Sequence, residues 1–360
     1  MTEKAYLVFE DGTVFEGAGF GARTTTTGEV VFDTSMTGYQ EMLTDPSFAG
    51  QLLTLTYPLV GNYGVNARDD ESAQVQVRGL IVREHCSTPS HFESTRTLDE
   101  YLSAAGVPGI SGIDTRAVAR KLRSSGVMMG MLTREMSPNE ALEALRNVPK
   151  YDSQLLAQGV STAEPYECNT MSDHDVLKVA LLDCGVKRSI IHFLNSVGCN
   201  VTVLPLSTPA DEIAALKPDG MLISPGPGDP SHLVTVEETI RSLLGKLPIM
   251  AICLGHQSVA RALGGKTFKL RFGHHGGNHP VKDIKTGRVT ITTQNHGYAV
   301  DDSVLPSGLE VSQFNLNDGT VEGLTHRDFP LLSIQYHAEG TPGPKDNNYL
   351  FERFVAMMRA

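Results

Sequence analysis

A single cysteine stands where the sequence pattern changes from strand to helix. The run 247–253 is apolar up to Cys253, Gly255 follows two residues later, and a helix-forming stretch begins at Ser258. Strand, tight turn and helix in this order resemble a nucleophile elbow, with a thiol in place of a serine hydroxyl. A helix N-terminus favours the thiolate and supplies N–H groups for an oxyanion. We predict that Cys253 is a nucleophile, although a lone cysteine is more often a small buried core residue.

A cysteine nucleophile needs a base and a group that orients the base. The strand-like run 331–336 ends in His337-Ala338-Glu339. Side chains alternate along an extended chain, so His337 and Glu339 are expected on the same side. A carboxylate that holds one imidazole nitrogen leaves the other free to face the thiol. Taken alone, this fragment is better interpreted as a histidine and a glutamate in a surface loop.

Two backbone donors are expected to stabilise the oxyanion. One is the N–H of Leu254, directly after the nucleophile, and the other comes from the segment 223–230, Ile-Ser-Pro-Gly-Pro-Gly-Asp-Pro. Its glycines, Gly226 and Gly228, let backbone amides approach a ligand without a Cβ clash, and its prolines stiffen the loop. By itself the segment also fits an ordinary tight turn.

The elements that must position these residues alternate between short apolar strands and helices. This rhythm predicts βαβ units around a mostly parallel sheet flanked by helices, with ligands outside the carboxyl ends of the strands. Cys253 lies at such an end. The expected strands are 176–182, 200–204, 220–223 and 249–253, and the expected helices are 188–197, 209–216 and 234–245.

The first part of the chain has a different order, with strands first and helices later. Strands are expected at 5–9, 13–15, 29–32, 52–56 and 75–82, and helices at 98–105, 115–124 and 138–147. This order predicts an α+β domain over 1–150. Residues 151–175 lack apolar periodicity and are interpreted as a linker, which leaves 176–360 for the α/β domain.

Composition limits the class of protein. The 360 residues carry a formal net charge of −11 with 40% hydrophobic content, which argues for a globular protein of about two domains and against nucleic-acid or anionic-membrane binding. No apolar run approaches the ~20 residues of a membrane span, and the N-terminus does not read as a signal peptide. Five scattered cysteines argue against a disulfide framework and predict a reducing, cytoplasmic setting.

Three separated motifs together resemble class I (triad) glutamine amidotransferases over about 176–360: Ser-Pro-Gly-Pro-Gly-Asp-Pro, Ile-Cys-Leu-Gly-His-Gln and the late His-x-Glu. In the other half, Thr34–Ser47 and Leu55–Gly64 resemble the N-terminal domain of carbamoyl-phosphate synthase small subunits. Phe272–Pro280 and Gln294–Tyr298 match the same family. That family commonly shows His-Pro-Glu, whereas this chain has alanine at 338, so a less rigid base is expected.

The resemblance implies a function and a site. It implies that Cys253, His337 and Glu339 hydrolyse L-glutamine and that the ammonia passes to a large subunit that uses ATP and Mg²⁺ to make carbamoyl phosphate for arginine and pyrimidine synthesis. No cofactor or metal is expected in this chain. The implied glutamine-binding residues are Ser47, Gly226, Gly228, Leu254, Gln257, Asn295, Gly297 and Tyr298.

Other signals are weaker. Gly264-Gly-Lys-Thr267 lacks the first glycine of a P-loop, because Ala260 occupies that position. His337-Ala-Glu339 also fits the His-x-Glu of zinc deaminases, but no cysteine follows Cys253. The cluster His274, His275 and His279 is interpreted as a structural loop. A stand-alone cysteine hydrolase, an amidotransferase subunit of another synthase and a non-enzymatic scaffold remain alternatives.

Overall fold

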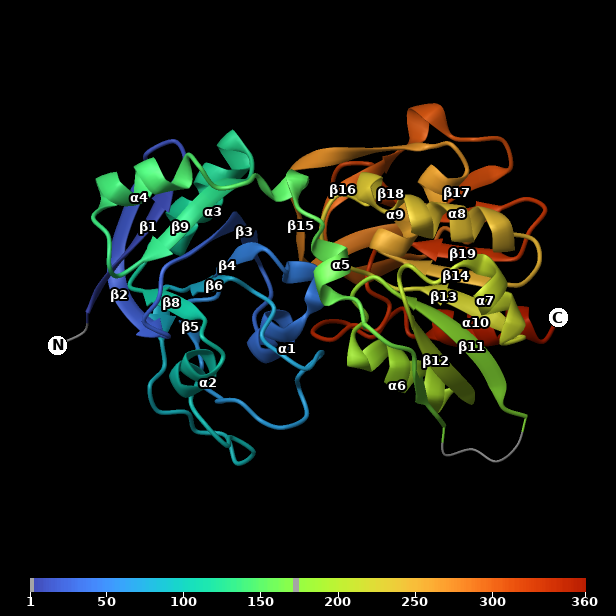
Figure 1. The fold of residues 1–360 in the computed structure, drawn as a ribbon, viewed down its shortest axis with the longest axis horizontal. Coiled ribbons are helices and arrows are strands. Elements are labelled where there is room, and N and C mark those ends of the chain that lie inside the picture. The colour runs from blue at the N-terminus through green and yellow to red at the C-terminus, as the bar shows by residue number, and fades with distance from the viewer. Residues whose placement is uncertain (1–2, 171–174) are drawn as a thin grey trace. The chain divides into compact units, whose positions relative to one another are not determined.

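The computed structural model describes residues 3–170 and 175–360 (Figure 1). The chain forms two compact units, which divide between Gln154 and Leu155. A short return segment, Arg271–His275, groups with the first unit. The predicted linker 151–175 lies across this division, and its residues 171–174 are outside the described part, as are residues 1 and 2 at the start of the predicted first domain.

The first unit is built on a closed barrel (blue to green in Figure 1). Its strands, in hydrogen-bonded order, are β1 (Lys4–Phe9), β2 (Val14–Gly21), β8 (Pro108–Ser111), β6 (Gly79–Ile81), β4 (Gln51–Leu55), β3 (Thr26–Asp33) and β9 (Met128–Thr133). Pairs β3–β4, β4–β6 and β6–β8 are parallel and the other pairs are antiparallel. Strands β5 (Leu59–Val60) and β7 (Glu84–His85) form a small separate pair.

Helices complete this α+β unit: α1 (Tyr39–Thr44), α2 (Leu98–Ala104), α3 (Thr115–Ser125) and α4 (Pro138–Leu145). Helices α2 and α4 each begin with a capping box, Thr97 with Glu100 and Ser137 with Glu140, which satisfies backbone N–H groups of the first turn. Both helices begin at the residues that the sequence pattern predicts, 98 and 138.

The second unit contains a ten-stranded mixed sheet (Figure 1). Its order is β10 (Tyr166–Cys168), β12 (Cys199–Pro205), β11 (Leu177–Asp183), β13 (Gly220–Ile223), β14 (Ile249–Ile252), β19 (Leu331–Ile334), β18 (Val321–His326), β17 (Leu309–Asn315), β15 (Lys266–Asp283) and β16 (Val289–Asp301). The central run from β12 to β19 is parallel, as the alternating pattern predicts, so the carboxyl ends of β11, β13, β14 and β19 share one edge.

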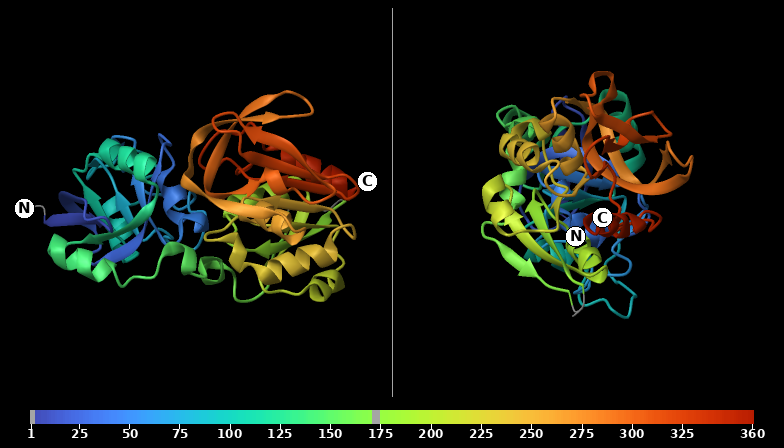
Figure 2. Two further views of the ribbon diagram at one scale, coloured as in Figure 1. Left: turned by 90° about the horizontal axis from the view of Figure 1, so that it is seen from above. Right: turned by 90° about the vertical axis from the view of Figure 1, so that its right-hand side faces the viewer.

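Helices cover both faces of this sheet. One buried apolar core includes residues of α5 (Leu156–Val160), α7 (Ala210–Ala215), α8 (Val234–Leu243) and α9 (Leu254–Ala262). The other includes residues of α6 (Arg188–Ser196) and α10 (Tyr349–Met358). In Figure 2 the yellow helices α8 and α9 and the red helix α10 lie on opposite sides of the sheet. No membrane-spanning helix is found among residues 3–170 and 175–360.

Most expected elements of the second unit match the structure within a few residues, and 220–223 matches fully. The interpreted linker is more structured than its lack of periodicity indicated, because helix α5 and strand β10 lie within it. Both are short, five and three residues, so neither leaves a periodic signal.

Candidate functional site

Cys253 occupies the turn between β14 and α9 with a left-handed backbone, φ 54° and ψ −105°. A non-glycine residue in this region is strained and signals a special role. Its N–H donates to the carbonyl of Ile334 at 2.9 Å, which ties the turn to β19. The side chain is 1% exposed, and the thiol lies 3.6 Å from the carbonyl oxygen of Asn295. The elbow expected from the sequence is therefore present.

His337 and Glu339 meet as the alternation predicts. The Nδ1 atom of His337 lies 2.7 Å from Oε1 of Glu339, and both side chains are fully buried. The His337 N–H donates to the carbonyl of Thr293, which links the end of β19 to β16. The ring also interacts with the Cys253 side chain, and its Nε2 atom has no other hydrogen-bond partner among the described protein groups.

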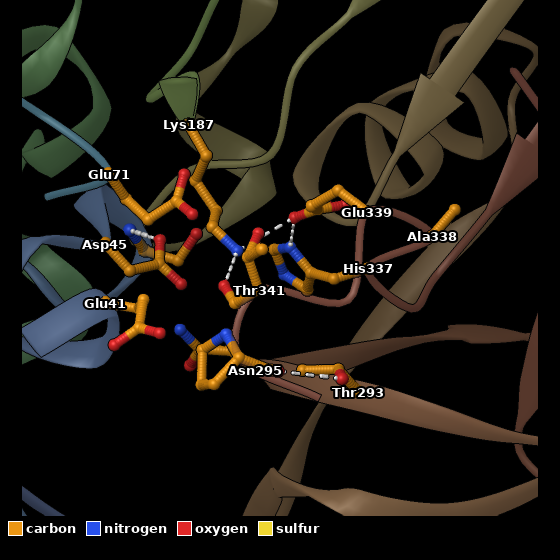
Figure 3. Close-up of polar contacts among 12 residues, drawn as sticks. Glu41, Asp45, Glu71, Lys187, Thr293, Asn295, His337, Ala338, Glu339 and Thr341 are labelled. Atoms are coloured by element: carbon orange, nitrogen blue, oxygen red, sulfur yellow. Dashed lines mark hydrogen bonds and ion pairs between the residues drawn. The ribbon is translucent and has the colours of Figure 1, made fainter. Parts of the chain in front are cut away.

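Lys187 completes this cluster, and no sequence motif pointed to it (Figure 3). Its Nζ atom donates to Oε1 of Glu339 at 3.0 Å and to the carbonyl of Thr341, although the side chain is only 1% exposed. A lysine beside a helix start ordinarily reads as a solvated charge. Its position after a strand that ends at the ligand-binding edge is the one feature that could have indicated a role.

The charges of this cluster reinforce one another. Burial alone would lower the pKa of His337, but the Glu339 carboxylate and the Cys253 thiol favour the imidazolium and raise that pKa to about 10. Burial acts in the opposite direction on Glu339, yet Lys187 and His337 hold the pKa of its carboxyl well below the ordinary value. The group next to Cys253 is therefore an imidazolium held by an ionised carboxylate near neutral pH.

The loop after His337 is fixed without the proline expected at position 338. Ala338 is fully buried, and the Asn348 side chain donates to the carbonyls of Ala338 and Glu339 at 2.8 and 3.3 Å. Gly340 adopts φ 63°, and a Cβ there would lie 2.2 Å from the carbonyl oxygen of Pro344. Packing and hydrogen bonds thus hold the loop in place of a proline, and a less rigid base stays a prediction.

The predicted oxyanion segment lies beside the nucleophile turn. A Cβ built on Gly226 would lie 2.0 Å from the Cys184 carbonyl oxygen and 3.0 Å from Cδ2 of Leu254, so the backbone here is packed closely. Gly228 adopts φ 94°, which favours glycine. The structure therefore places Gly226 beside the Leu254 side chain, and the binding of an oxyanion by the N–H groups of these two residues stays a prediction.

The other expected glutamine-binding residues come from α9 and β16. Gln257 is buried, and its amide nitrogen donates to the Tyr298 carbonyl at 2.8 Å and to Oε1 of Gln335 at 3.1 Å. Asn295 and Tyr298 are buried, whereas no surrounding atom lies within 4 Å of a Cβ built on Gly297. Gln257 is thus held by the chain itself, and the space beside Gly297 is open.

Ser47 belongs to the first unit, in the short helix Pro46–Phe48. Asp45 caps this helix by accepting the Ser47 N–H at 2.8 Å. The Ser47 side chain is 5% exposed, and its Oγ has no hydrogen-bond partner among the described residues. A buried hydroxyl without a partner is costly, which is typical of a group that a ligand completes. Its reach to glutamine stays a prediction.

Comparisons with known proteins find a matching family for each half of the chain. Residues 7–132 match the model of the carbamoyl-phosphate synthase small chain, CPSase domain, and residues 180–357 match glutamine amidotransferase class-I. The chain is similar over nearly its full length to carbamoyl phosphate synthase small chains from three organisms. The relative from Archaeoglobus fulgidus is 51% identical with 99% of both chains covered. Those from Akkermansia muciniphila and Listeria monocytogenes are 48% and 50% identical, with 99% of this chain and 98% and 97% of the relatives covered. The chain therefore belongs to the family of carbamoyl phosphate synthase small chains.

Proposed function

We propose that this chain is the glutamine-hydrolysing subunit of a carbamoyl-phosphate synthase. It releases ammonia from L-glutamine through a cysteine thioester and passes it to a large ATP-using subunit, which makes carbamoyl phosphate from bicarbonate. The full-length similarity to carbamoyl phosphate synthase small chains supports this over an amidotransferase of another synthase. The observation that carries the proposal is the buried group of Lys187, Glu339 and His337 beside the Cys253 elbow.

The first chemical step is thioester formation. The Cys253 thiolate attacks the side-chain amide carbon of glutamine, and the tetrahedral oxyanion accepts hydrogen bonds from the N–H groups of Leu254 and Gly226. His337, protonated and held by Glu339, donates its proton to the departing ammonia as the carbon–nitrogen bond breaks. The raised pKa of His337 suits this role because the imidazolium is the prevailing form.

The second step regenerates the thiolate. Having lost its proton, His337 accepts one from the water that attacks the glutamyl thioester. The tetrahedral intermediate collapses to glutamate as the carbon–sulfur bond breaks, and the sulfur leaves as a thiolate beside the reprotonated His337, which restores the starting state. Lys187 keeps Glu339 ionised throughout, so that the carboxylate can hold the imidazole in one orientation.

Glutamine carries a zwitterionic head and a neutral amide, which backbone amides, hydroxyls and carboxamides can bind without a metal. The residues that we assign to this task beside the oxyanion donors are Ser47, Gly228, Gln257, Asn295, Gly297 and Tyr298. The unpartnered Ser47 hydroxyl and the open space at Gly297 support the assignment.

This chain needs no cofactor of its own in the proposed scheme. ATP and Mg²⁺ belong to the large subunit, and the complex supplies carbamoyl phosphate to arginine and pyrimidine synthesis in the cytoplasm. The incomplete P-loop motif at Gly264–Thr267 supports the assignment of ATP to the large subunit, because Ala260 occupies the position of the glycine that the motif requires.

The test uses the chain purified together with its large subunit. Cys253→Ser should abolish synthesis with glutamine as nitrogen donor and leave synthesis from added ammonia near the wild-type rate. Equal loss of both activities would contradict the assignment of Cys253. The chain alone should bind no ATP, and tight ATP binding would place the synthase chemistry in this subunit instead.

The same preparation separates the alternatives. A stand-alone cysteine hydrolase would co-purify with no large ATP-using chain and would cleave peptide or γ-glutamyl substrates. An amidotransferase of another synthase would co-purify with a different partner and form a different product.

A further inference from the structure

Asp183 is a buried carboxylate that the proposed mechanism does not use. It ends β11 at the ligand-binding edge of the sheet and is 3% exposed. Its two oxygens serve two different parts of the chain. Oδ1 accepts the N–H groups of Gly185 and Val186 at 2.9 and 2.8 Å, and Oδ2 accepts the N–H of Thr162 at 2.7 Å.

The first set of bonds fixes the turn that delivers Lys187. Only Cys184, Gly185 and Val186 separate Asp183 from Lys187, which is the N-cap residue of α6 and whose side chain makes no capping hydrogen bond to that helix. Gly185 adopts φ 136°, so the turn cannot rely on an ordinary backbone well for its shape. The direction in which Lys187 leaves this turn, and hence its contact with Glu339, depends on the Asp183 carboxylate.

The second bond reaches into the segment that connects the two units. Thr162 follows helix α5, which starts two residues after the division at Gln154 and Leu155. Ala157 of α5 shares a buried core with Leu233, next to the loop that carries Gly226 and Gly228. The connecting segment is therefore seated on the same unit as the candidate triad.

We propose that Asp183 is a positioning residue that couples the connecting segment to the triad. One oxygen holds the segment through Thr162, the other holds the turn that aims Lys187 at Glu339, and a displacement of the segment therefore moves Lys187. The inference rests on the proposed function, since it assumes that Lys187 and Glu339 serve glutamine hydrolysis. It adds a link from the segment after the division between the units to Lys187, and through Glu339 to His337.

The surroundings of Asp183 suit this role. Burial raises the pKa of its carboxyl, and backbone N–H groups of Val186, Thr162 and Gly185 oppose that rise. Tyr166 and Cys184 feel its charge, and no lysine or arginine pairs with it among the described residues. A carboxylate held only by backbone N–H groups loses its ionised form most easily when one donor moves away.

The test removes the donor on the segment side and leaves Asp183 in place. Thr162→Pro deletes the N–H, and Ser161, at φ −65° and ψ 145°, already has the conformation that a following proline requires. Thr162→Val is the matched control, because it keeps the N–H and loses only the hydroxyl. In the full chain with its large subunit, Thr162→Pro should lower kcat for glutamine hydrolysis by about 10-fold with KM within about 2-fold, whereas Thr162→Val should match the wild type.

A second variant tests the same path from its other end. Asp183→Asn should lower kcat at least as much. The double variant Asp183→Asn/Thr162→Pro should be no slower than Asp183→Asn alone, because both changes break the same hydrogen bond between Thr162 and Asp183. Asp219→Asn, which alters a carboxylate accepting the Lys178 N–H at the other end of β11, should have little effect. Multiplicative effects in the double variant would overturn the coupling.

The pH profile separates positioning from loss of folded protein. Lys187 and His337 are the charged groups that face Glu339, and both lower the pKa of its carboxyl. If Lys187 is displaced, that pKa rises and the acidic limb of kcat/KM moves to higher pH in both variants. Loss of folded protein would scale the profile without moving the limb, and that result would reject the proposal.

The outcomes for the two proposals are distinct. If Cys253→Ser keeps glutamine hydrolysis, the proposed function fails. If Cys253→Ser is inactive but Thr162→Pro behaves like Thr162→Val, the function stands and the coupling through Asp183 is wrong.

Discussion

Two cysteines end parallel strands of the same sheet, and their surroundings differ. Cys184 follows β11 and Cys253 follows β14; both side chains are buried, at 0% and 1% exposure. Burial and the charge of Asp183 raise the pKa of the Cys184 thiol far above its ordinary value. Cys253 instead has a left-handed backbone and lies in electrostatic contact with His337. Both cysteines are buried at the end of a strand. The neighbouring histidine and the strained backbone of Cys253 are therefore what distinguish the candidate nucleophile.

The largest expected difference between the two thiols is in their reactivity. Iodoacetamide should label Cys253 more than roughly 100-fold faster than Cys184, as followed by peptide mass spectrometry over time. Glutamine should slow the labelling of Cys253 alone. Cys184→Ala should retain glutamine hydrolysis within a few-fold, and comparable labelling of the two thiols would contradict the assignment of Cys253 as the reactive cysteine.

The next largest effect is expected from the group that supports the base. Glu339→Gln should lower kcat for glutamine hydrolysis by about 100-fold, because a neutral amide cannot stabilise the imidazolium. With that carboxylate gone, burial dominates and the pKa of His337 should fall from about 10, which NMR titration of the ring nitrogens measures. Glu310→Gln, at a surface ion pair with Arg327, is the control. An unchanged His337 titration would remove Glu339 from the site.

Gly226 lies between the two cysteine turns, and a side chain there should disturb both. Gly226→Ala places a Cβ 2.0 Å from the Cys184 carbonyl oxygen, and we expect a loss of about 1–3 kcal/mol in the free energy of unfolding. Gly159→Ala in α5, where a Cβ meets no atom within 4 Å, should be neutral or stabilising. Urea denaturation of the two variants side by side measures the contrast, and equal stability would show that the backbone around Gly226 has room for a methyl group.

The smallest effects are expected in the pH dependence of stability. The carboxyl groups near the two cysteine turns, Glu339 and Asp183, should change the free energy of unfolding in opposite directions as the pH falls. The pKa of Glu339 is lowered by folding, so its contribution to stability is present above about pH 4.5 and is lost as the pH falls below that value. The pKa of Asp183, beside Cys184, is raised, so the folded state binds its proton more readily and gains stability as the pH falls.

Measured between pH 6 and 3, the stability of the wild type relative to Glu339→Gln should therefore decrease, and relative to Asp183→Asn it should increase. Denaturant titrations at four or five pH values provide the test. Parallel curves for the two variants would contradict the assigned directions.

Much of the site was predictable because the chemistry follows strand ends. The run 249–253 is a short apolar strand that stops at a cysteine. The position of this cysteine at the carboxyl edge of the sheet follows from βαβ connectivity alone. The pairing of His337 with Glu339 follows from alternation over three residues. In both cases the decisive interaction is local in sequence or set by topology.

Other parts depend on contacts that no local pattern encodes. Lys187 meets Glu339 across 152 positions, and only the folded sheet buries it. Strand β9 was missed because Gly130 interrupts its β-forming run; in the barrel a Cβ there would lie 2.5 Å from Cγ2 of Val30, so glycine is required for packing. Closure of the barrel by β9 could not be inferred from strand order either.

The left-handed backbone of Cys253 also makes this position a place where folding and activity have opposite preferences. At φ 54° and ψ −105° glycine is less strained than any side chain, and such strain costs on the order of 1–3 kcal/mol. Selection for stability alone would favour glycine at 253, and selection for glutamine hydrolysis keeps cysteine. A Cys253→Gly protein should therefore be inactive, with little or no loss of stability despite the missing thiol. The difference in free energy of unfolding between Cys253→Gly and Cys253→Ala would measure the backbone strain that the chain accepts at its nucleophile.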